Sequence, residues 1–319
     1  MKVSLLILVH NAEAYIEKCA RSLFSQTYDR IEYVFVDDAT PDRSMDVLRG
    51  VLSEFPGRHP DVKIITNPCN LGLAESRNVA LDNATGDYVL YVDSDDHLAP
   101  RAVELLAGRA VADNADIVVY DCYVVRDGEV RAKREFFPDS KDGYIRAMLL
   151  RQVRVAMWAK LVRRSLFDKH DLRFIPGMNY GEDFYLSPML AYYAAKVVKL
   201  EQPLYYYLRH SASISYALSP DKADNVIRAA ELLSDFFTHV PDSGVYMPML
   251  DCMKIMNKVA ILQAGNMETW KHVNGLYSDT DHRQCGLRMS QRLILWLHKR
   301  RWWWAMRAYR SVAKLLKRE

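Results

Sequence analysis

Acidic side chains gather at three places where their carboxylates could do chemistry. Asp93-Ser94-Asp95-Asp96 directly follows the apolar run Tyr88–Val92, Asp37-Asp38 follows another apolar run, and Glu182-Asp183 follows Gly181. Carboxylates crowded this closely repel one another, and a divalent cation such as Mg²⁺ or Mn²⁺, which prefers carboxylate oxygen, would offset that repulsion. Asp is also favoured at helix N-termini. The first motif alone therefore leaves a metal site and a capping turn open.

The other motifs carry groups for hydrogen bonding and proton transfer. A carboxylate of Asp37-Asp38 could bind a base or a ribose hydroxyl, or cap the next helix. Glu182-Asp183, expected in a glycine-flanked loop, suits a general base, although two adjacent acids more often lie in a solvated loop. Asn70–Asn78 places Gly72 at a helix start, where a ligand can approach closely. Arg77 in this segment could brace an aspartate or a phosphate, or lie on the surface of an ordinary helix.

Strands and helices alternate through the first hundred residues. Short continuous apolar runs predict strands at 3–9, 33–36, 62–65 and 88–92, and helical spacing predicts helices at 12–25, 41–55 and 71–83. This alternation favours a parallel sheet covered by helices, in which ligands bind beyond the carboxyl ends of the strands. Two of the expected strands end in clustered aspartates, so the acids gather where a ligand is expected.

The rest of the chain is less regular until its C-terminal part. We expect a helix at 99–112, strands at 116–121 and 204–208, and helices from about residue 221 onward, with Pro220 as the boundary. No apolar run approaches the about 20 residues that span a bilayer. The five cysteines are odd in number, far apart and without a CxxC pair, so disulfides and a zinc cluster are not expected and a reducing cytoplasm is the natural setting.

The C-terminal segment is strongly basic. Residues 288–319 carry ten Lys or Arg and one acid, whereas the remaining chain carries 33 basic and 39 acidic residues. We draw this tail as one ideal helix, with about 100° per residue. An apolar stripe that includes Leu293 and Leu297 then lies beside an arc of basic residues, and Trp302–Trp304 lie between the two. The pattern predicts an interfacial helix on an anionic membrane. The alternative is a stripe packed on the body; nothing else in the chain indicates nucleic-acid binding.

The acidic and glycine motifs occur in the order found in the family 2 inverting glycosyltransferases with the GT-A fold, which the sequence resembles over residues 1–215. The matching segments are Val3–Asn11, Val36–Asp42, Asn70–Asn78, Gly86–Asp96, Trp158–Leu161 and Gly181–Asp183. The resemblance implies an α/β GT-A fold: a Rossmann-like, mostly parallel sheet with flanking helices, in a catalytic domain at 1–215. Its nucleotide-sugar half would be 1–98 and its acceptor half 99–215. A helical C-terminal region with the basic tail, 216–319, would follow.

The same resemblance assigns roles to individual residues. Asp183 would be the catalytic base, and Asp93 and Asp95 the metal-binding pair for Mn²⁺ or Mg²⁺, with Asp95 the more direct ligand. The expected donor-binding residues are His10, Asn11, Asp38, Arg77, Asp93, Ser94, Asp95, Trp158, Lys160, Arg209 and His210. Asp38 would bind the nucleotide base. Trp158, which could equally pack in the core, and Lys160 belong to a motif near the acceptor and diphosphate.

Three departures qualify the resemblance. His10 stands where the family often has Tyr, Ala39 where it often has Gly, and the QxxRW motif of processive synthases is absent. Transfer of a single sugar is therefore favoured over polymerisation. The expected reaction moves one sugar from a nucleotide-diphosphate sugar, with a UDP-sugar as the expected donor, to a hydroxyl of a saccharide or lipid-linked saccharide. The expected place is the cytoplasm, peripheral on the inner face of the cell membrane.

Other classes of protein fit the motifs less well. A metal-dependent nucleotidyltransferase or phosphatase also gathers aspartates at strand ends, but it does not account for the Gly181–Asp183 loop. A dinucleotide dehydrogenase is disfavoured because no GxGxxG follows the first strand. A membrane- or nucleic-acid-binding adaptor built around the basic tail is the non-enzymatic alternative.

Overall fold

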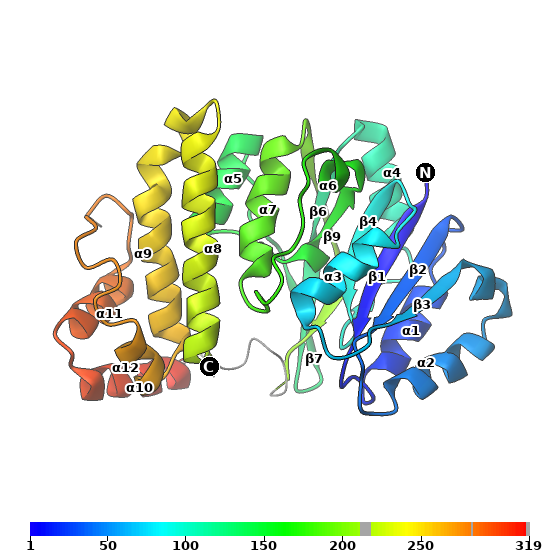
Figure 1. Cartoon of the computed structure of the whole chain (residues 1–319), viewed down its shortest axis with the longest axis horizontal. Coiled ribbons are helices and arrows are strands. Elements are labelled where there is room, and N and C mark those ends of the chain that lie inside the picture. Colours follow the sequence, from blue (N-terminus) through cyan, green and yellow to red (C-terminus); the bar gives the residue numbers. More distant parts are fainter. Residues whose placement is uncertain (211–217, 282, 317–319) are drawn as a thin grey trace. The chain divides into compact units, whose positions relative to one another are not determined.

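The computed structural model describes residues 1–210, 218–281 and 283–316. The chain divides into two compact units. The first consists of Met1–Ile145 and Val153–His210, and the second of Arg146–Gln152 and Ser211–Glu319. Figure 1 shows the elements of each unit, and the two units are described separately below.

The first unit begins with four parallel strands in the order β3-β2-β1-β4. Their bounds are β1 Val3–Val9, β2 Ile31–Asp37, β3 Val62–Thr66 and β4 Tyr88–Asp93. The helices between them are α1 Ile16–Phe24, α2 Ser44–Ser53 and α3 Leu73–Asp82, and the 3-10 helix η1 spans Pro56–Asp61. The predicted parallel sheet with flanking helices is confirmed.

Both faces of this sheet are covered, which explains why its strands are largely apolar. Leu5 and Ile7 of β1 belong to one apolar cluster with Leu23 of α1 and Leu48 of α2. Alternate residues of a strand point to opposite faces, and Leu6 is buried on the other face. α3 packs on β1 and lies in front of the strands in Figure 1. The carboxyl ends of β1, β2 and β4 are thereby left at one edge of the sheet.

The remaining strands of this unit make the sheet mixed. β8 (Lys160–Arg163) is antiparallel to β4 and to β6 (Ile117–Arg126), and β9 (Val197–Leu208) is parallel to β6. β5 (His97–Leu98) pairs with β9 and β7 (Glu129–Lys133) with β6, both antiparallel. The helices are α4 Ala102–Asp113, α6 Ser165–Lys169, α7 Glu182–Tyr193 and the 3-10 helix η2 Met157–Ala159. Helix α5, Lys141–Leu149, begins in this unit and ends in the segment assigned to the second.

One expectation about this unit is wrong. Glu182 and Asp183 do not lie in a loop: they form the first turn of α7, directly after Gly181, whose φ is 87°. α7 buries residues on most of its surface and contains Pro188, so its sequence lacks the one-sided apolar spacing of an amphipathic helix. Both acids consequently project from a rigid helix end rather than from a loop.

The second unit is helical, as predicted from about residue 221 onward. Its elements are α8 Pro220–His239, the 3-10 helix η4 Ser243–Val245, α9 Met247–Ala264, α10 Met267–His272, α11 Met289–Lys299 and α12 Trp303–Leu316. Ser219 accepts a hydrogen bond from the amide of Lys222 and caps α8. In the described part of the chain, no helix combines the length and the apolar character needed to cross a membrane.

Two expectations about the second unit are wrong. The tail is not one helix, because Arg301 adopts a left-handed φ of 57° and separates α11 from α12. Disulfides were not expected, but Cys252 of α9 and Cys285 are joined by one across 33 positions of sequence. A bond between residues so distant in sequence depends on how the helices pack, which cysteine spacing does not reveal. Disulfides are typical of oxidising compartments, so the cysteines no longer argue for a reducing cytoplasm.

Candidate active site

The carboxyl end of β4 carries the acidic cluster. Carboxylate oxygens of Asp93, Asp95 and Asp96 all lie within 4.8 Å of one another. The turn is held by two contacts to β9: the Tyr205 hydroxyl lies 3.1 Å from the Asp93 amide, and the Leu208 amide donates to Asp96 Oδ1 at 2.6 Å. Burial, with the charge of Asp95 adding to it, raises the pKa of Asp93 to about 6. The fold thus holds the acids together against their mutual repulsion.

The donor set of this cluster fits Mn²⁺ or Mg²⁺. Both cations prefer carboxylate oxygens and take only a few ligands from the protein. Asp96 is buried, and within the described residues its Oδ2 atom has no hydrogen-bond partner. Burial also raises the pKa of Asp96, with Asp95 and Asp93 contributing. A cation at this cluster would offset the repulsion between the carboxylates, and Asp93 and Asp95 remain the proposed ligands.

A buried arginine connects this cluster to the first turn of α7. Arg77 Nη1 donates to Glu182 Oε1 at 2.8 Å and to Asp183 Oδ1 at 2.5 Å, and Nη2 lies 3.4 Å from Asp93 Oδ1. The guanidinium also lies over the rings of Tyr91 and Phe174, at 5.6 and 5.4 Å. Arg77 is only 2% exposed. The guanidinium of Arg77 therefore hydrogen-bonds to carboxylates in the interior, and it holds Asp183 beside the proposed metal site.

The two acids of α7 have different surroundings. The Glu182 side chain is 7% exposed and that of Asp183 is 19% exposed. Burial, together with the neighbouring charge of Asp183, raises the pKa of Glu182 to about 8. The more accessible carboxylate, Asp183, is the better placed of the two to reach a substrate.

Asp38 lies at the carboxyl end of β2 and is almost fully buried. Its carboxylate accepts hydrogen bonds from Asn67 Nδ2 at 2.9 Å and from the amides of Leu71 and Gly72 at 2.8 and 3.0 Å. Gly72 has φ 85°, and a Cβ there would collide with Asn179. Asp38 thus holds the start of α3 in place, and its role in binding a nucleotide base remains a prediction.

The other residues expected near the base lie beside Asp38. His10 Nδ1 is 3.0 Å from the Asp38 carbonyl oxygen, and Nε2 is 3.0 Å from Asn70 Nδ2. Asn11 is exposed and has a left-handed φ of 52°, and its amide donates to Thr40 Oγ1 at 2.9 Å. Arg77, expected in this group, instead contacts the acids described above.

The end of β9 brings one further predicted residue to the acidic cluster. His210 Nε2 lies 2.8 Å from Asp95 Oδ2, and its ring stacks on Tyr15 with 4.6 Å between ring centroids. The neighbouring Arg209 is exposed. An imidazole held against Asp95 is close enough to contact anything that the aspartate binds.

Trp158 and Lys160 lie in the interior. Trp158 stacks on Tyr205 and Tyr207, at 4.3 and 5.3 Å between centroids, and belongs to the apolar core. Lys160 is 1% exposed, and its ammonium donates to the carbonyls of Val155 and Ala156 at 2.8 and 2.6 Å and to Ser187 Oγ at 3.0 Å. Burial lowers the pKa of Lys160 to about 7.

The contacts of Lys160 explain its place in the fold. Ser187 lies one helical turn after Asp183 on α7, so the ammonium ties the segment before η2 to the helix that presents the proposed base. Three acceptors match the three N–H groups of an ammonium. The structure therefore places Lys160 as a brace for α7.

We expect Lys160→Met to lower the free energy of unfolding by about 1–3 kcal/mol, because it removes the ammonium that donates to the Ala156 carbonyl and to Ser187 Oγ. Chemical denaturation followed by circular dichroism measures the effect. Lys196→Met is the matched control, since that lysine is 49% exposed and makes a surface ion pair; it should change the free energy by less than about 0.5 kcal/mol. Equal stability of the two variants would contradict the brace.

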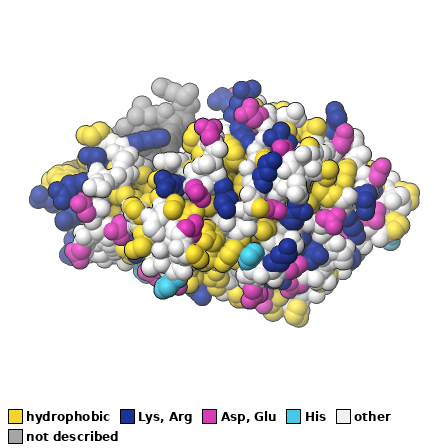
Figure 2. Space-filling view, turned by 90° about the horizontal axis from the view of Figure 1, so that it is seen from above, with side chains coloured by type: hydrophobic (Ala, Val, Ile, Leu, Met, Phe, Trp, Pro, Cys, Tyr) yellow, Lys and Arg dark blue, Asp and Glu magenta, His cyan; other side chains and the backbone are white. Residues whose placement is uncertain are grey.

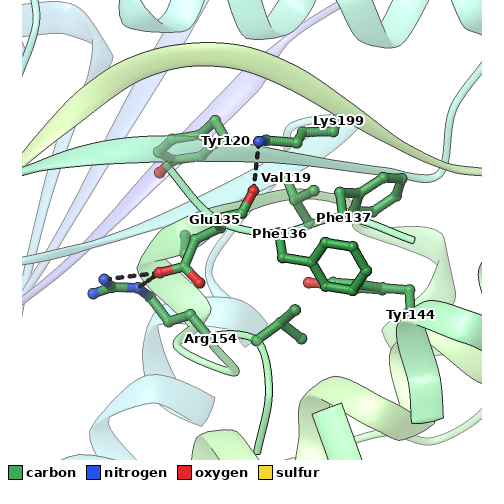
Figure 3. Close-up of a pocket in the computed structure, with 10 residues that line it drawn as sticks. Val119, Tyr120, Glu135, Phe136, Phe137, Tyr144, Arg154 and Lys199 are labelled. Atoms are coloured by element: carbon green, nitrogen blue, oxygen red, sulfur yellow. Dashed lines mark hydrogen bonds and ion pairs between the residues drawn. The ribbon is translucent and has the colours of Figure 1, made fainter. Parts of the chain in front are cut away.

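A small cavity lies elsewhere in the first unit. Figure 3 shows Glu135, whose carboxylate pairs with Arg154 and whose carbonyl oxygen accepts from Lys199, beside Phe136, Phe137 and Tyr144. None of its lining residues belongs to the acidic cluster. Its free space of about 20 Å³ is that of a single water molecule, so it is too small for a sugar or a nucleotide.

Several residues at the site were given no individual role from the sequence. Glu182 and Asp96 were named only as members of the acidic motifs that contain Asp183 and Asp95. Tyr205 and Asn67 lie outside these motifs and reach the site through pairing of distant strands and through a loop.

Comparison with known proteins agrees with the fold. Residues 4–171 match the family model described as glycosyl transferase family 2. The chain therefore belongs to glycosyl transferase family 2. Similar curated proteins include the putative glycosyltransferase EpsH of Bacillus subtilis, 33% identical over 66% of this chain and 62% of that protein. The glycosyltransferase GlyA of Streptococcus pneumoniae is 31% identical over 67% of this chain and 31% of that protein.

The curated relatives are longer than the part matched: the chain covers 62% of EpsH and 31% of GlyA. Among solved structures, Staphylococcus aureus TarS in complex with UDP-GlcNAc matches with a TM-score of 0.70 and 19% identity, over 100% of this chain and 92% of that one. A Pyrobaculum calidifontis mannosyltransferase in complex with GDP-Man and Mn²⁺ matches with a TM-score of 0.55 and 18% identity, over 100% and 88%. These similarities confirm the GT-A fold.

Proposed function

We propose that the chain transfers one sugar from a nucleotide-diphosphate sugar to a hydroxyl of a saccharide or lipid-linked saccharide, with inversion at the anomeric carbon. One observation carries the proposal: buried Arg77 holds Asp183 and Asp93 in a single hydrogen-bonded cluster. A proton acceptor and a set of metal-binding carboxylates are thereby placed side by side. UDP is the proposed nucleotide because TarS, the structure matching with a TM-score of 0.70, was solved with UDP-GlcNAc.

The proposed chemistry assigns a separate task to each group. Asp183 accepts the proton of the acceptor hydroxyl while that oxygen attacks the anomeric carbon from the face opposite the diphosphate. A divalent cation held by Asp93 and Asp95 would supply Lewis-acid stabilisation of the leaving diphosphate. His210, next to Asp95, and Arg209 are proposed to contact the diphosphate. His10, Asn11 and Asp38 would bind the nucleoside at the ends of β1 and β2.

Two further parts of the proposal concern place and acceptor. The basic C-terminal region would associate with an anionic membrane surface, where a lipid-linked acceptor would be found, and no nucleic acid is involved. We propose the inner face of the cell membrane. Since the Cys252–Cys285 disulfide is typical of oxidising compartments, this placement rests on the basic C-terminal region and not on the cysteines.

The reaction is tested with a panel of nucleotide sugars. We expect a UDP-sugar together with Mn²⁺ to raise the melting temperature, because a ligand at about 100 times its Kd stabilises the folded state by about 2.7 kcal/mol. Without an acceptor, the protein should hydrolyse the same donor slowly. NMR should show that the sugar first released has the anomeric configuration opposite to that of the donor. If only GDP-sugars stabilise the protein, the donor is a GDP-sugar and the choice of UDP is wrong. If no nucleotide sugar stabilises it, the proposed sugar transfer is contradicted.

A further inference from the structure

Helix α11 of the second unit has two apolar faces. One face, with Ile294, Leu295 and Leu297, is buried within the unit. On the other face Met289, Leu293 and Trp296 are 80%, 43% and 45% exposed. Their spacing of four and three positions makes them neighbours along the helix. The exposed apolar face is therefore continuous and is not part of the packing of the unit.

The exposed face continues beyond the break at Arg301. Trp302 and Trp304 are 41% and 72% exposed. The rings of Trp296 and Trp302 meet edge to face at 5.0 Å, and those of Trp302 and Trp304 stack at 6.3 Å. We call Met289, Leu293, Trp296, Trp302 and Trp304 the tryptophan face. It holds five of the ten large hydrophobic side chains exposed in the described part of the chain, so it is a patch rather than scattered exposure.

The segment that carries this face is basic. Where its side chains are described, the exposed basic residues of α11, α12 and the turn between them are Arg292, Lys299, Arg300, Arg301 and Arg307. The Arg300 guanidinium lies 5.6 Å from the centre of the Trp296 ring. Residues 283–316 contain no Asp or Glu. In Figure 2 dark-blue Lys and Arg side chains border yellow hydrophobic ones at the left, the side of the view on which Figure 1 draws α11.

We infer that the tryptophan face is a docking surface for a bilayer that contains anionic lipid. Tryptophan rings favour the headgroup level of a membrane, and basic residues near an anionic leaflet are attracted to it. The inference rests on the membrane association proposed above, but not on the sugar-transfer chemistry. It also replaces the helix predicted from sequence, whose stripe passed through Leu297, because that residue is buried.

Charge and shape argue for lipid over other occupants. A second copy of the chain would bring the same cations against this face, with no acid in the segment to pair with them. A nucleic acid would stack its bases on open aromatic rings. Here, however, Trp296 and Trp302 contact each other edge to face, and Met289 and Leu293 extend the face with aliphatic surface. Acyl chains and headgroups match that combination.

Vesicle flotation of the full chain tests the inference. The chain should float with phosphatidylcholine vesicles containing phosphatidylglycerol and much less with phosphatidylcholine alone. Trp302→Ser with Trp304→Ser should lower the partition coefficient by about 10- to 100-fold, since two large apolar side chains are lost. Trp304→Ser alone is a second variant, and it should also lower the partition coefficient. The Trp304 side chain is 72% exposed, so this change leaves the contact between Trp296 and Trp302 in place.

The matched control is Phe136→Ser, because Phe136 is 63% exposed in the first unit and lies outside the face; it should float like the parent. UDP binding with Mn²⁺ is measured on every variant, so a failure of the donor site is distinguished from a failure of docking. Unchanged flotation of both tryptophan variants would overturn the inference. So would a dimer in analytical ultracentrifugation that the variants abolish, or release from vesicles by an equimolar oligonucleotide.

Discussion

Replacing Asp183 with asparagine is expected to lower the transfer rate by about 10²–10⁴-fold, the usual loss on removal of a general base. An asparagine carbonyl can still accept a hydrogen bond from Arg77 Nη1, which lies 2.5 Å from Asp183 Oδ1 in the parent. The first turn of α7 should therefore keep its position, and donor binding should be unchanged. Steady-state kinetics with the donor found in the panel, and calorimetry with UDP, measure the two quantities separately.

Glu182→Gln is the matched control for this prediction. Glu182 is adjacent, bonds the same Arg77 nitrogen at 2.8 Å, and is more buried than Asp183. If Asp183 is the base, Glu182→Gln should retain most of the rate. A larger loss of rate in Glu182→Gln than in Asp183→Asn would show that Glu182, and not Asp183, accepts the proton. Near-parent turnover of purified Asp183→Asn would remove Asp183 from the mechanism.

The four parallel strands and the aspartates at their ends were predictable because both signals are local. A strand buried on both faces is a short, continuous apolar run, and parallel strands end at one edge. Asp93 and Asp38 follow directly from that geometry. Position within the strand pattern, however, does not show what a side chain contacts. The partners of Arg77 on α7 are 105 and 106 residues away in sequence.

Lys160 and the tail show where local signals end. The resemblance places Lys160 in a motif near the acceptor and diphosphate, and that role stays a prediction; residue spacing gave no sign that its ammonium is paired inside the unit. The tail was drawn as one ideal helix, but the left-handed backbone of Arg301 separates α11 from α12. The spacing of residues in the sequence predicts neither a tertiary hydrogen bond nor the φ angle of a single residue.

Asp95→Ala is expected to weaken Mn²⁺-dependent binding of UDP by more than about 100-fold, since loss of an outer partner of a metal ligand already costs about 10–100-fold. Asp93→Ala should be milder. Arg77 Nη2 lies 3.4 Å from Asp93 Oδ1, so part of the Asp93 charge is already balanced by the protein. Among the described residues, Asp95 forms no ion pair with an arginine; its partner is His210, at 2.8 Å.

Calorimetry with UDP, in Mn²⁺ and then in a chelator, measures this difference. Asp46→Ala is the surface control, because Asp46 is 67% exposed and only 3.8 Å from Arg49. In chelator all four proteins should bind UDP equally weakly, since the metal contribution is then absent from each. The opposite result is metal-dependent UDP binding that survives in Asp95→Ala and disappears in Asp93→Ala. It would make Asp93 the more direct metal ligand, and the ion pair between Asp93 and Arg77 would then not lower the contribution of Asp93 to metal binding.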